Sequence, residues 1–227
     1  MNKRNILVPI DFSEISEAGL KTAIDIANQI DANIHLLHIV EEHSDLGFKT
    51  DADMESSARE ASEHDHFMVE LIKKTKQQVD DLLLRYKSEK IKLIPFVEFG
   101  DYEEQLNIHL KENPTDMVVM DTSGETNISE FFSGNHASQA IRIANVPVLA
   151  VKAYYPIIAK DNMLILISLK DYDLQKVGLI KKFADIMQLN VLIGHVKQFK
   201  DVIKSDLYAE LQKFALDNNF SIVKSTL

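Results

Sequence analysis

The 227-residue sequence contains no cysteine. This absence excludes a disulfide framework, thiolate zinc sites and a cysteine nucleophile, and it suits a reducing compartment. No apolar run approaches the ~20 residues that a membrane-spanning helix needs. The opening MNKRNILVPIDFSE passes from charged residues directly into a strand pattern, without the apolar region of a signal peptide. We therefore expect a cytoplasmic protein that makes no contact with a membrane.

Positive charge is also scarce. The chain has 25 Lys and Arg against 35 Asp and Glu, which gives a formal net charge of -10. Nucleic-acid binding depends mainly on clustered basic side chains, so we expect no nucleic-acid partner. A composition that is 45% hydrophobic and 26% charged is that of a globular protein able to bury a core.

Strand and helix patterns alternate over the first two thirds of the chain. Apolar runs typical of strands buried on both faces lie at 5–10, 33–40, 91–99, 116–120 and 146–152. Helical spacing of apolar residues is present over 14–30, 54–89, 101–112 and 134–144. Pro95 favours an edge position for its strand, because proline donates no hydrogen bond to a neighbour. This alternation predicts an α/β fold with a doubly wound, five-stranded parallel sheet.

The remaining residues repeat the start of the chain. Residues 162–196 align without a gap onto residues 5–39, with NMLILI opposite NILVPI and NVLIGHV opposite NIHLLHI. After residue 196 the sequence can supply a second helix and a third strand, but no counterpart of the last two strands. We expect a complete domain over 1–153, a linker over 154–161 and a partial second domain over 162–227.

The candidate ligand site lies at the carboxyl ends of the predicted strands, where open parallel sheets bind ligands. Pro9, Ile10 and Asp11 end the first strand, and Val40 ends the second. The fourth strand leads into Met120-Asp121-Thr122-Ser123-Gly124, and after nine residues Gly134-Asn135-His136 opens a helix. Glycine lets the backbone approach an anion, and the free N–H groups of a helix start face it. This pattern is typical of a phosphate cradle.

These segments together resemble the universal stress protein family. The resemblance rests on VPIDFSE, LLHIVEE, the Gly-x9-Gly helix opening and VPVLAVK, in this order, over residues 1–152. It implies a Rossmann-like fold of the adenine nucleotide alpha hydrolase type, with ATP or another adenine nucleotide as the ligand. It also implies that the second part of the chain is half of a tandem repeat.

The resemblance implies a role for each site residue. Asp11 would contact adenine or ribose, and Pro9, Ile10 and Val40 would line the base. Gly124, Gly134 and Asn135 would hold the phosphates, with Met120 and His136 beside them.

Two positions depart from the pattern of the family's ATP-binding members. Asn135 replaces Ser or Thr, a mild change because an amide still hydrogen-bonds to phosphate. Asp121 replaces the first glycine of the loop, and its carboxylate would repel a triphosphate by roughly 1–3 kcal/mol. A bound Mg²⁺ would reverse that repulsion. In the second part Ser168 stands opposite Asp11, and no phosphate loop follows, so we expect no nucleotide site there.

Other chemistries find less support. His35 and His38 are three apart on a strand and point to opposite faces, while Glu63, His64 and His66 do not share one helical face. We therefore expect no metal site. The chain has neither a nucleophile elbow nor a Walker A motif, so we expect no catalytic residues.

Three functional hypotheses follow: a nucleotide-responsive regulatory module, a nucleotide-free interaction scaffold, and a weak ATP hydrolase or adenylyl-transfer enzyme. The first is preferred. In the resembled family the fifth strands commonly pair across a two-fold axis. We therefore expect a homodimer through the strand at Val146–Lys152.

Overall fold

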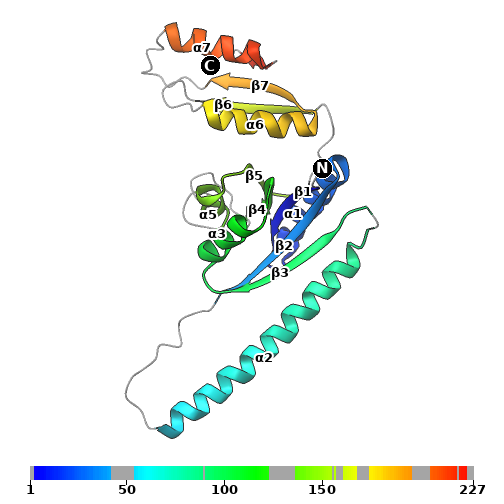
Figure 1. Ribbon diagram of the computed structural model, residues 1–227, viewed down its shortest axis with the longest axis vertical. Helices are drawn as coiled ribbons and strands as arrows, with labels where there is room; N and C mark the ends of the chain where they lie inside the picture. The colour runs from blue at the N-terminus through cyan, green and yellow to red at the C-terminus, as the bar shows by residue number, and fades with distance from the viewer. Residues whose placement is uncertain are drawn as a thin grey trace. The chain divides into compact units, whose positions relative to one another are not determined.

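The computed structural model describes residues 3–41, 54–88, 90–122, 136–154, 156, 161–167, 174–195, 205–218 and 220–223. The chain divides into two compact units. The first comprises Met1–Ala144 with Val148–Tyr154, and the second comprises Asn145–Pro147 with Tyr155–Leu227. Each unit contains its own parallel sheet, as Figure 1 shows.

The first unit is built on a sheet with the strand order β3-β2-β1-β4-β5. Its strands are β1 (Arg4–Pro9), β2 (Ala32–Val40), β3 (Leu93–Phe99), β4 (Met117–Asp121) and β5 (Val148–Val151). Every pairing is parallel. The predicted doubly wound fold is therefore confirmed, and the strand that carries Pro95 lies at an edge of the sheet.

Helices cover both faces of this sheet. They are α1 (Glu14–Ile30), α3 (Tyr102–Glu112) and α5 (His136–Ile143), whereas most of α2 (Met54–Arg85) extends away from the sheet (Figure 1). α1 packs on β1, β2 and β4, and the end of α2 is joined to it through Glu17, which accepts a hydrogen bond from the Tyr86 hydroxyl (2.9 Å). α3 and α5 contact each other on the opposite face (Figure 1).

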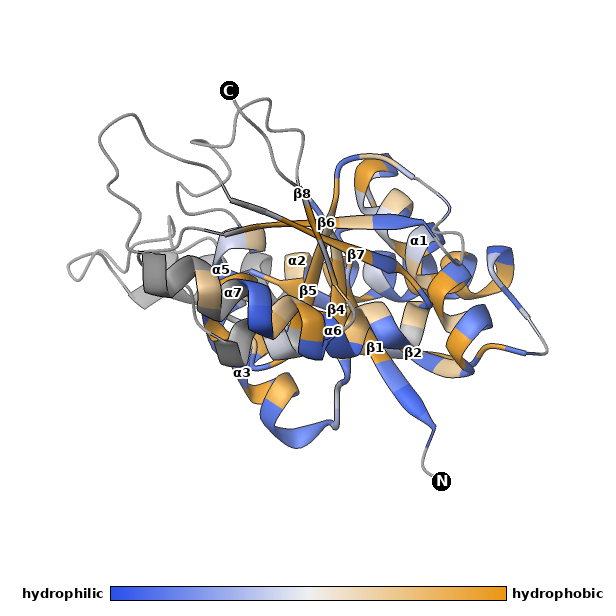
Figure 2. Cartoon of the chain, turned by 90° about the horizontal axis from the view of Figure 1, so that it is seen from above, coloured by the Kyte–Doolittle hydropathy of each residue, from blue (hydrophilic) through white to orange (hydrophobic). Residues whose placement is uncertain are grey.

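The strands consist of nearly continuous runs of apolar residues, and these side chains are buried in the fold. Ile6, Leu7 and Val8 of β1 are fully buried, as are Val118 and Val119 of β4. Burying each such side chain contributes roughly 1.5–3 kcal/mol relative to leaving it in water. Figure 2 shows the hydrophobic colour along β4 and β5, while the helices carry both hydrophobic and hydrophilic residues.

Helix α1 keeps its predicted bounds because both of its ends are capped. The Ser13 hydroxyl accepts a hydrogen bond from the Ser16 N–H (3.1 Å), which satisfies a free donor of the first turn. At the other end Asp31 takes the left-handed conformation (φ 53°), and its N–H donates to the Ala27 carbonyl.

Several elements are shorter than the sequence patterns indicate, and for two of them the structure shows the cause. β5 begins at Val148 because Pro147, just before it, has no N–H to donate to the neighbouring strand. α2 ends at Arg85, and the Lys87 N–H donates to the Leu84 carbonyl in a tightened last turn. None of the helices in the described ranges combines the length and the apolar character of a membrane span.

A pair of buried histidines lies between α3 and the sheet. His35 of β2 and His109 of α3 are 6% and 3% exposed, and their ring centroids are 5.6 Å apart. Phe96 of β3 packs against both rings. Burial lowers the pKa of His35, while burial and the neighbouring His35 lower the pKa of His109 to about 4. Both rings are therefore neutral at pH 7.

The second unit holds β6 (Asn162–Ile167), α6 (Leu174–Met187), β7 (Asn190–His195), α7 (Ser205–Asp217) and β8 (Ser221–Val223). The three strands are parallel, in the order β6-β7-β8. A small core holds them together, formed by Ile165, Ala184, Val191, Ile193, Ala215 and Phe220. The same succession of strands and helices opens the first unit, so the second sheet fits a partial repeat of that fold.

Candidate functional site

The carboxyl edge of the first sheet gathers acidic side chains from three neighbouring strands. Asp11 follows β1, Glu41 follows β2, and Asp121 is the last residue of β4. Because the strands are parallel, these positions lie at one edge, and β1 and β4 are the pair at which the strand order reverses. Helix α5 also begins at this edge, with His136. We call Asp11, Glu41, Tyr102, Asp121 and His136 the carboxyl-edge site.

Asp11 lies in a tight turn between β1 and α1. Its carboxylate accepts a hydrogen bond from the Ser13 N–H (2.9 Å), and Phe12 between them has a positive φ of 63°. Partial burial raises the pKa of Asp11, but hydrogen bonds from Ser13 and Ser16 lower it by more. The pKa therefore lies below the ordinary value, and the carboxylate is charged at pH 7.

The other predicted residues of this edge are packed into the protein. Pro9, Ile10, Val40 and Met120 are all buried. The Ile10 carbonyl accepts from His38 Nδ1 (2.8 Å), and the Val40 carbonyl accepts from the Gly100 N–H (3.1 Å). These residues form the buried layer beneath the edge, and the Ile10 and Val40 carbonyls already have hydrogen-bond partners.

Helix α1 approaches the end of β4 closely at Gly19. A Cβ atom added there would lie 3.3 Å from the Asp121 nitrogen and 3.4 Å from the Met120 carbonyl carbon. Only glycine leaves this space without displacing backbone. The absence of a side chain at Gly19 thus lets α1 lie close against the end of β4, next to Asp121.

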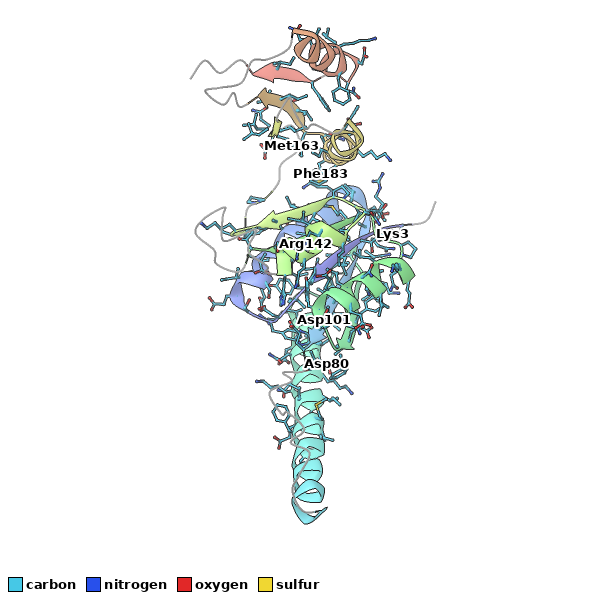
Figure 3. All side chains as sticks on the ribbon, turned by 90° about the vertical axis from the view of Figure 1, so that its left-hand side faces the viewer. Lys3, Asp80, Asp101, Arg142, Met163 and Phe183 are labelled. Atoms are coloured by element: carbon cyan, nitrogen blue, oxygen red, sulfur yellow. The ribbon has the colours of Figure 1, made fainter. Side chains whose placement is uncertain are left out.

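Tyr102 and His136 join two helix starts to the end of β2. The His136 ring stacks on the Tyr102 ring, with centroids 3.9 Å apart and planes 12° apart. His136 Nε2 lies 2.9 Å from Glu41 Oε1. Tyr102 is the first residue of α3, directly after Asp101, whose carboxylate caps the helix by accepting from the Glu104 N–H (2.9 Å); Figure 3 labels Asp101.

The Tyr102 hydroxyl has no hydrogen-bond partner among the described residues, and the side chain is only 6% exposed. Burial raises the pKa of this phenol strongly, and the negative charges of Asp121 and Glu41 raise it further. The hydroxyl therefore keeps its proton, and it is a buried donor that no described residue accepts from.

The sequence singled out His136, Asp11 and Asp121, and it missed Glu41 and Tyr102. Glu41 and Tyr102 are ordinary members of polar stretches. Their contacts with His136 arise only from the order of the strands. Gly124, Gly134 and Asn135 lie outside the described residues, so the phosphate cradle stays a prediction. No group of three or more His, Asp or Glu side chains in the described ranges is placed to hold a metal ion.

An open hollow of about 910 Å³ lies at the opposite, amino-terminal edge of the sheet. It is lined by the end of α2 and the starts of β2 and β3, including Asn33, Asp80, Lys87 and Leu93. None of the predicted site residues borders it. Its position, away from the point where the strand order reverses, separates it from the carboxyl-edge site.

The strand order and the polar residues at its carboxyl edge define a Rossmann-like α/β protein, and β1 and β4 are the strands at which sheets of this kind bind ligands. Residues 2–152 match the sequence model of the universal stress protein family, and the chain belongs to that family. The resemblance predicted from the sequence is therefore confirmed.

Similar proteins agree with this assignment. Universal stress protein MJ0531 of Methanocaldococcus jannaschii is 26% identical over 149 residues, which are 66% of this chain and 82% of the relative. Universal stress protein G of Escherichia coli O157:H7 is 28% identical over 151 residues, 66% of this chain and 99% of the relative. A universal stress protein structure from Archaeoglobus fulgidus shares the fold with a TM-score of 0.65 at 16% identity. That comparison covers 96% of this chain and 74% of the other.

Proposed function

We propose that the chain is a cytoplasmic stress-response regulator whose first unit binds an adenine nucleotide at the carboxyl-edge site. The observation that carries the proposal is the placement of Asp11, Glu41 and Asp121 at one edge of the sheet, next to the point where the strand order reverses, with the start of α5 in contact with Glu41. Membership of the universal stress protein family supports it. The free N–H groups at a helix start favour phosphate, and an ionised Asp11 is a fitting acceptor for ribose or adenine.

The proposed role is binding without turnover. The ligand would contact residues from β1, β2 and β4 and from the starts of α3 and α5, so its presence would change how these helices are held. A protein partner would read the resulting surface. Mg²⁺ would accompany ATP, because the cation offsets the repulsion between phosphates and the Asp121 carboxylate.

Titration calorimetry of ATP and AMP into the wild type and into Asp121→Gly tests the proposal. We expect the substitution to raise ATP affinity by about tenfold to a hundredfold, because it removes a charge beside the phosphates. Asp11→Asn should weaken both ligands. Asp31→Asn is the matched control, since Asp31 is an exposed cap at the other end of α1, where it pairs with Lys3. The absence of binding by every protein would reject nucleotide recognition.

The second candidate function is a nucleotide-free interaction scaffold. The placement of Asp11, Glu41 and Asp121 at one edge of the sheet favours it, since carboxylates repel phosphates. In this case no adenine nucleotide would raise the melting temperature, with or without Mg²⁺, and none would co-purify with the protein.

We also propose that the chain forms a homodimer through β5. This strand lies at the edge of the sheet, and its sequence Val-Leu-Ala-Val carries no charge. An exposed apolar edge strand is a template for pairing with a second chain. Light scattering should give twice the mass of 25.8 kDa, and a strict monomer at high concentration would contradict the proposal.

A further inference from the structure

Helix α2 (Met54–Arg85) extends away from the sheet for most of its length, as Figure 1 shows. One side of the helix is covered, since Thr75 and Leu82 are buried. The side that faces away from these two residues carries Val69 and Leu84, which are 46% and 71% exposed. Exposed apolar side chains among charged ones are typical of a surface that contacts another chain.

Five exposed residues form a straight line along this side of the helix. Their spacing of four, three, four and four residues follows the helical period of 3.6, so they share one face over a length of about 22 Å. We call this line the α2 stripe; its members are Val69, Lys73, Lys76, Asp80 and Leu84. Within the described part of the chain no ion pair engages Lys73 or Asp80, and Figure 3 labels Asp80.

The α2 stripe is complementary to a second copy of itself. Its two ends are apolar, and Lys73 and Asp80 each lie four residues inside opposite ends. If two α2 helices lie antiparallel about a two-fold axis at the centre of the stripe, each Lys73 faces an Asp80 and each Lys76 lies beside the uncharged Gln77. A parallel pair would set like charges against each other at every charged position. Charge therefore selects the antiparallel arrangement.

The hollow at the amino-terminal edge of the sheet lies at one end of the stripe, since Asp80 and Leu84 both border it. Its lining is basic although the chain as a whole is acidic, with one aspartate against Lys3, Lys87, Lys90 and Lys92. In the antiparallel pair, residues 54–67 of the partner's α2 continue past Leu84 toward this hollow. That part of the sequence is acidic, with Glu55, Glu60, Glu63 and Asp65 against Arg59. The charges of the two copies thus match beyond the stripe as well as along it.

We propose that the α2 stripe is an interface between two copies of the chain, in which the helices lie antiparallel about a two-fold axis near Lys76. The interface is isologous, because the same residues serve on both sides. It is separate from the pairing proposed at β5, and neither contact requires the other.

Site-specific cross-linking tests the arrangement, because the chain has no cysteine and any introduced thiol is unique. Val69→Cys and Leu84→Cys variants of the full chain are mixed in equal amounts and treated with a short bis-maleimide, which joins thiols. We expect covalent dimers that join position 69 to position 84. Either variant alone should give none, because its two thiols lie about 22 Å apart along the helix axis in the antiparallel pair.

Charge reversal tests the ion pairs. Lys73→Glu in both chains should lower the yield of the 69–84 cross-link by about tenfold, because two attractions become repulsions. Adding Asp80→Lys should restore the yield, since the charge that faces residue 73 is then reversed as well. Lys74→Glu is the matched control, because Lys74 is also exposed but lies off the stripe, and it should leave the yield unchanged.

The possible results have distinct meanings. A 69–84 cross-link that falls with Lys73→Glu and returns with the double reversal supports the interface, and any dimer mass left in Lys73→Glu then belongs to β5. Cross-linking of Val69→Cys with itself shows parallel helices and overturns the arrangement. A yield that is equal with and without Lys73→Glu shows random collision and overturns the interface. Thiols that react with neither the bis-maleimide nor a single maleimide show that another part of the same chain covers the stripe, which also overturns the proposal.

Discussion

The buried histidine pair should make the first unit lose stability in mild acid. His109 is neutral in the folded state because burial and the neighbouring His35 lower its pKa to about 4. In the unfolded chain the same ring returns to its ordinary value of 6.5. Below pH 6.5 the unfolded state therefore takes up a proton that the folded state refuses, and unfolding becomes easier.

The size of the loss follows from the two pKa values. Stability is fully present above pH 6.5 and falls as the pH drops toward 4. Proton linkage at this one ring lowers the unfolding free energy by about 2 kcal/mol between pH 7.5 and pH 5. The full loss, reached below pH 4, is about 3 kcal/mol. His35 adds to it in the same direction, since its pKa is also lowered by burial.

Urea unfolding followed by circular dichroism at pH 7.5 and pH 5 measures the effect. His109→Leu keeps an apolar side chain of similar size beside Phe96 and cannot titrate, so its loss over this interval should be smaller than that of the wild type by about 2 kcal/mol. His66→Leu is the control, because His66 is exposed on α2 and should leave the pH dependence unchanged. Equal pH dependence in the wild type and His109→Leu would refute the assignment of the buried neutral ring.

Further outcomes concern the elements that shape the carboxyl edge. Gly19→Ala should lower the unfolding free energy by about 1–2 kcal/mol, because its Cβ meets the backbone of β4. Gly178→Ala, in α6 with no atom within 4 Å of the added Cβ, should instead raise it by up to about 1 kcal/mol, and urea titrations of the two variants compare them. Asp101→Ala should cost about 1 kcal/mol by removing the cap of α3, and faster amide exchange at Glu104 should report the loss.

Much of the first fold could be predicted because its signals are local. The apolar run around Ile6 and the spacing of Leu20, Ala23 and Ala27 follow from burial on a strand and on one helix face. Pro95 indicated an edge strand because proline has no N–H to donate to a neighbouring strand. The alternation of strands and helices then restricts the sheet to a few topologies, since parallel crossovers are right-handed.

The candidate site could be predicted only where it follows directly from a strand. Asp11 and Asp121 were found because each directly follows a predicted strand, and the carboxyl ends of parallel strands lie at one edge of the sheet. Tyr102 and Glu41 could not be found in this way, because their meeting with His136 depends on where three separate loops turn. His109 was missed for a similar reason, since its partner His35 lies on a distant strand.

Helix α5 is short, and its two ends lie near different parts of the first unit. It contains eight residues, so it is about 12 Å long, and it carries His136 at one end while the chain enters β5 soon after the other. A helix of two turns is stiff along its axis and cannot absorb a displacement internally. A displacement of the stacked ring pair would therefore pass along the whole of α5 and reach β5, the outermost strand of the sheet, through only the four residues 144–147.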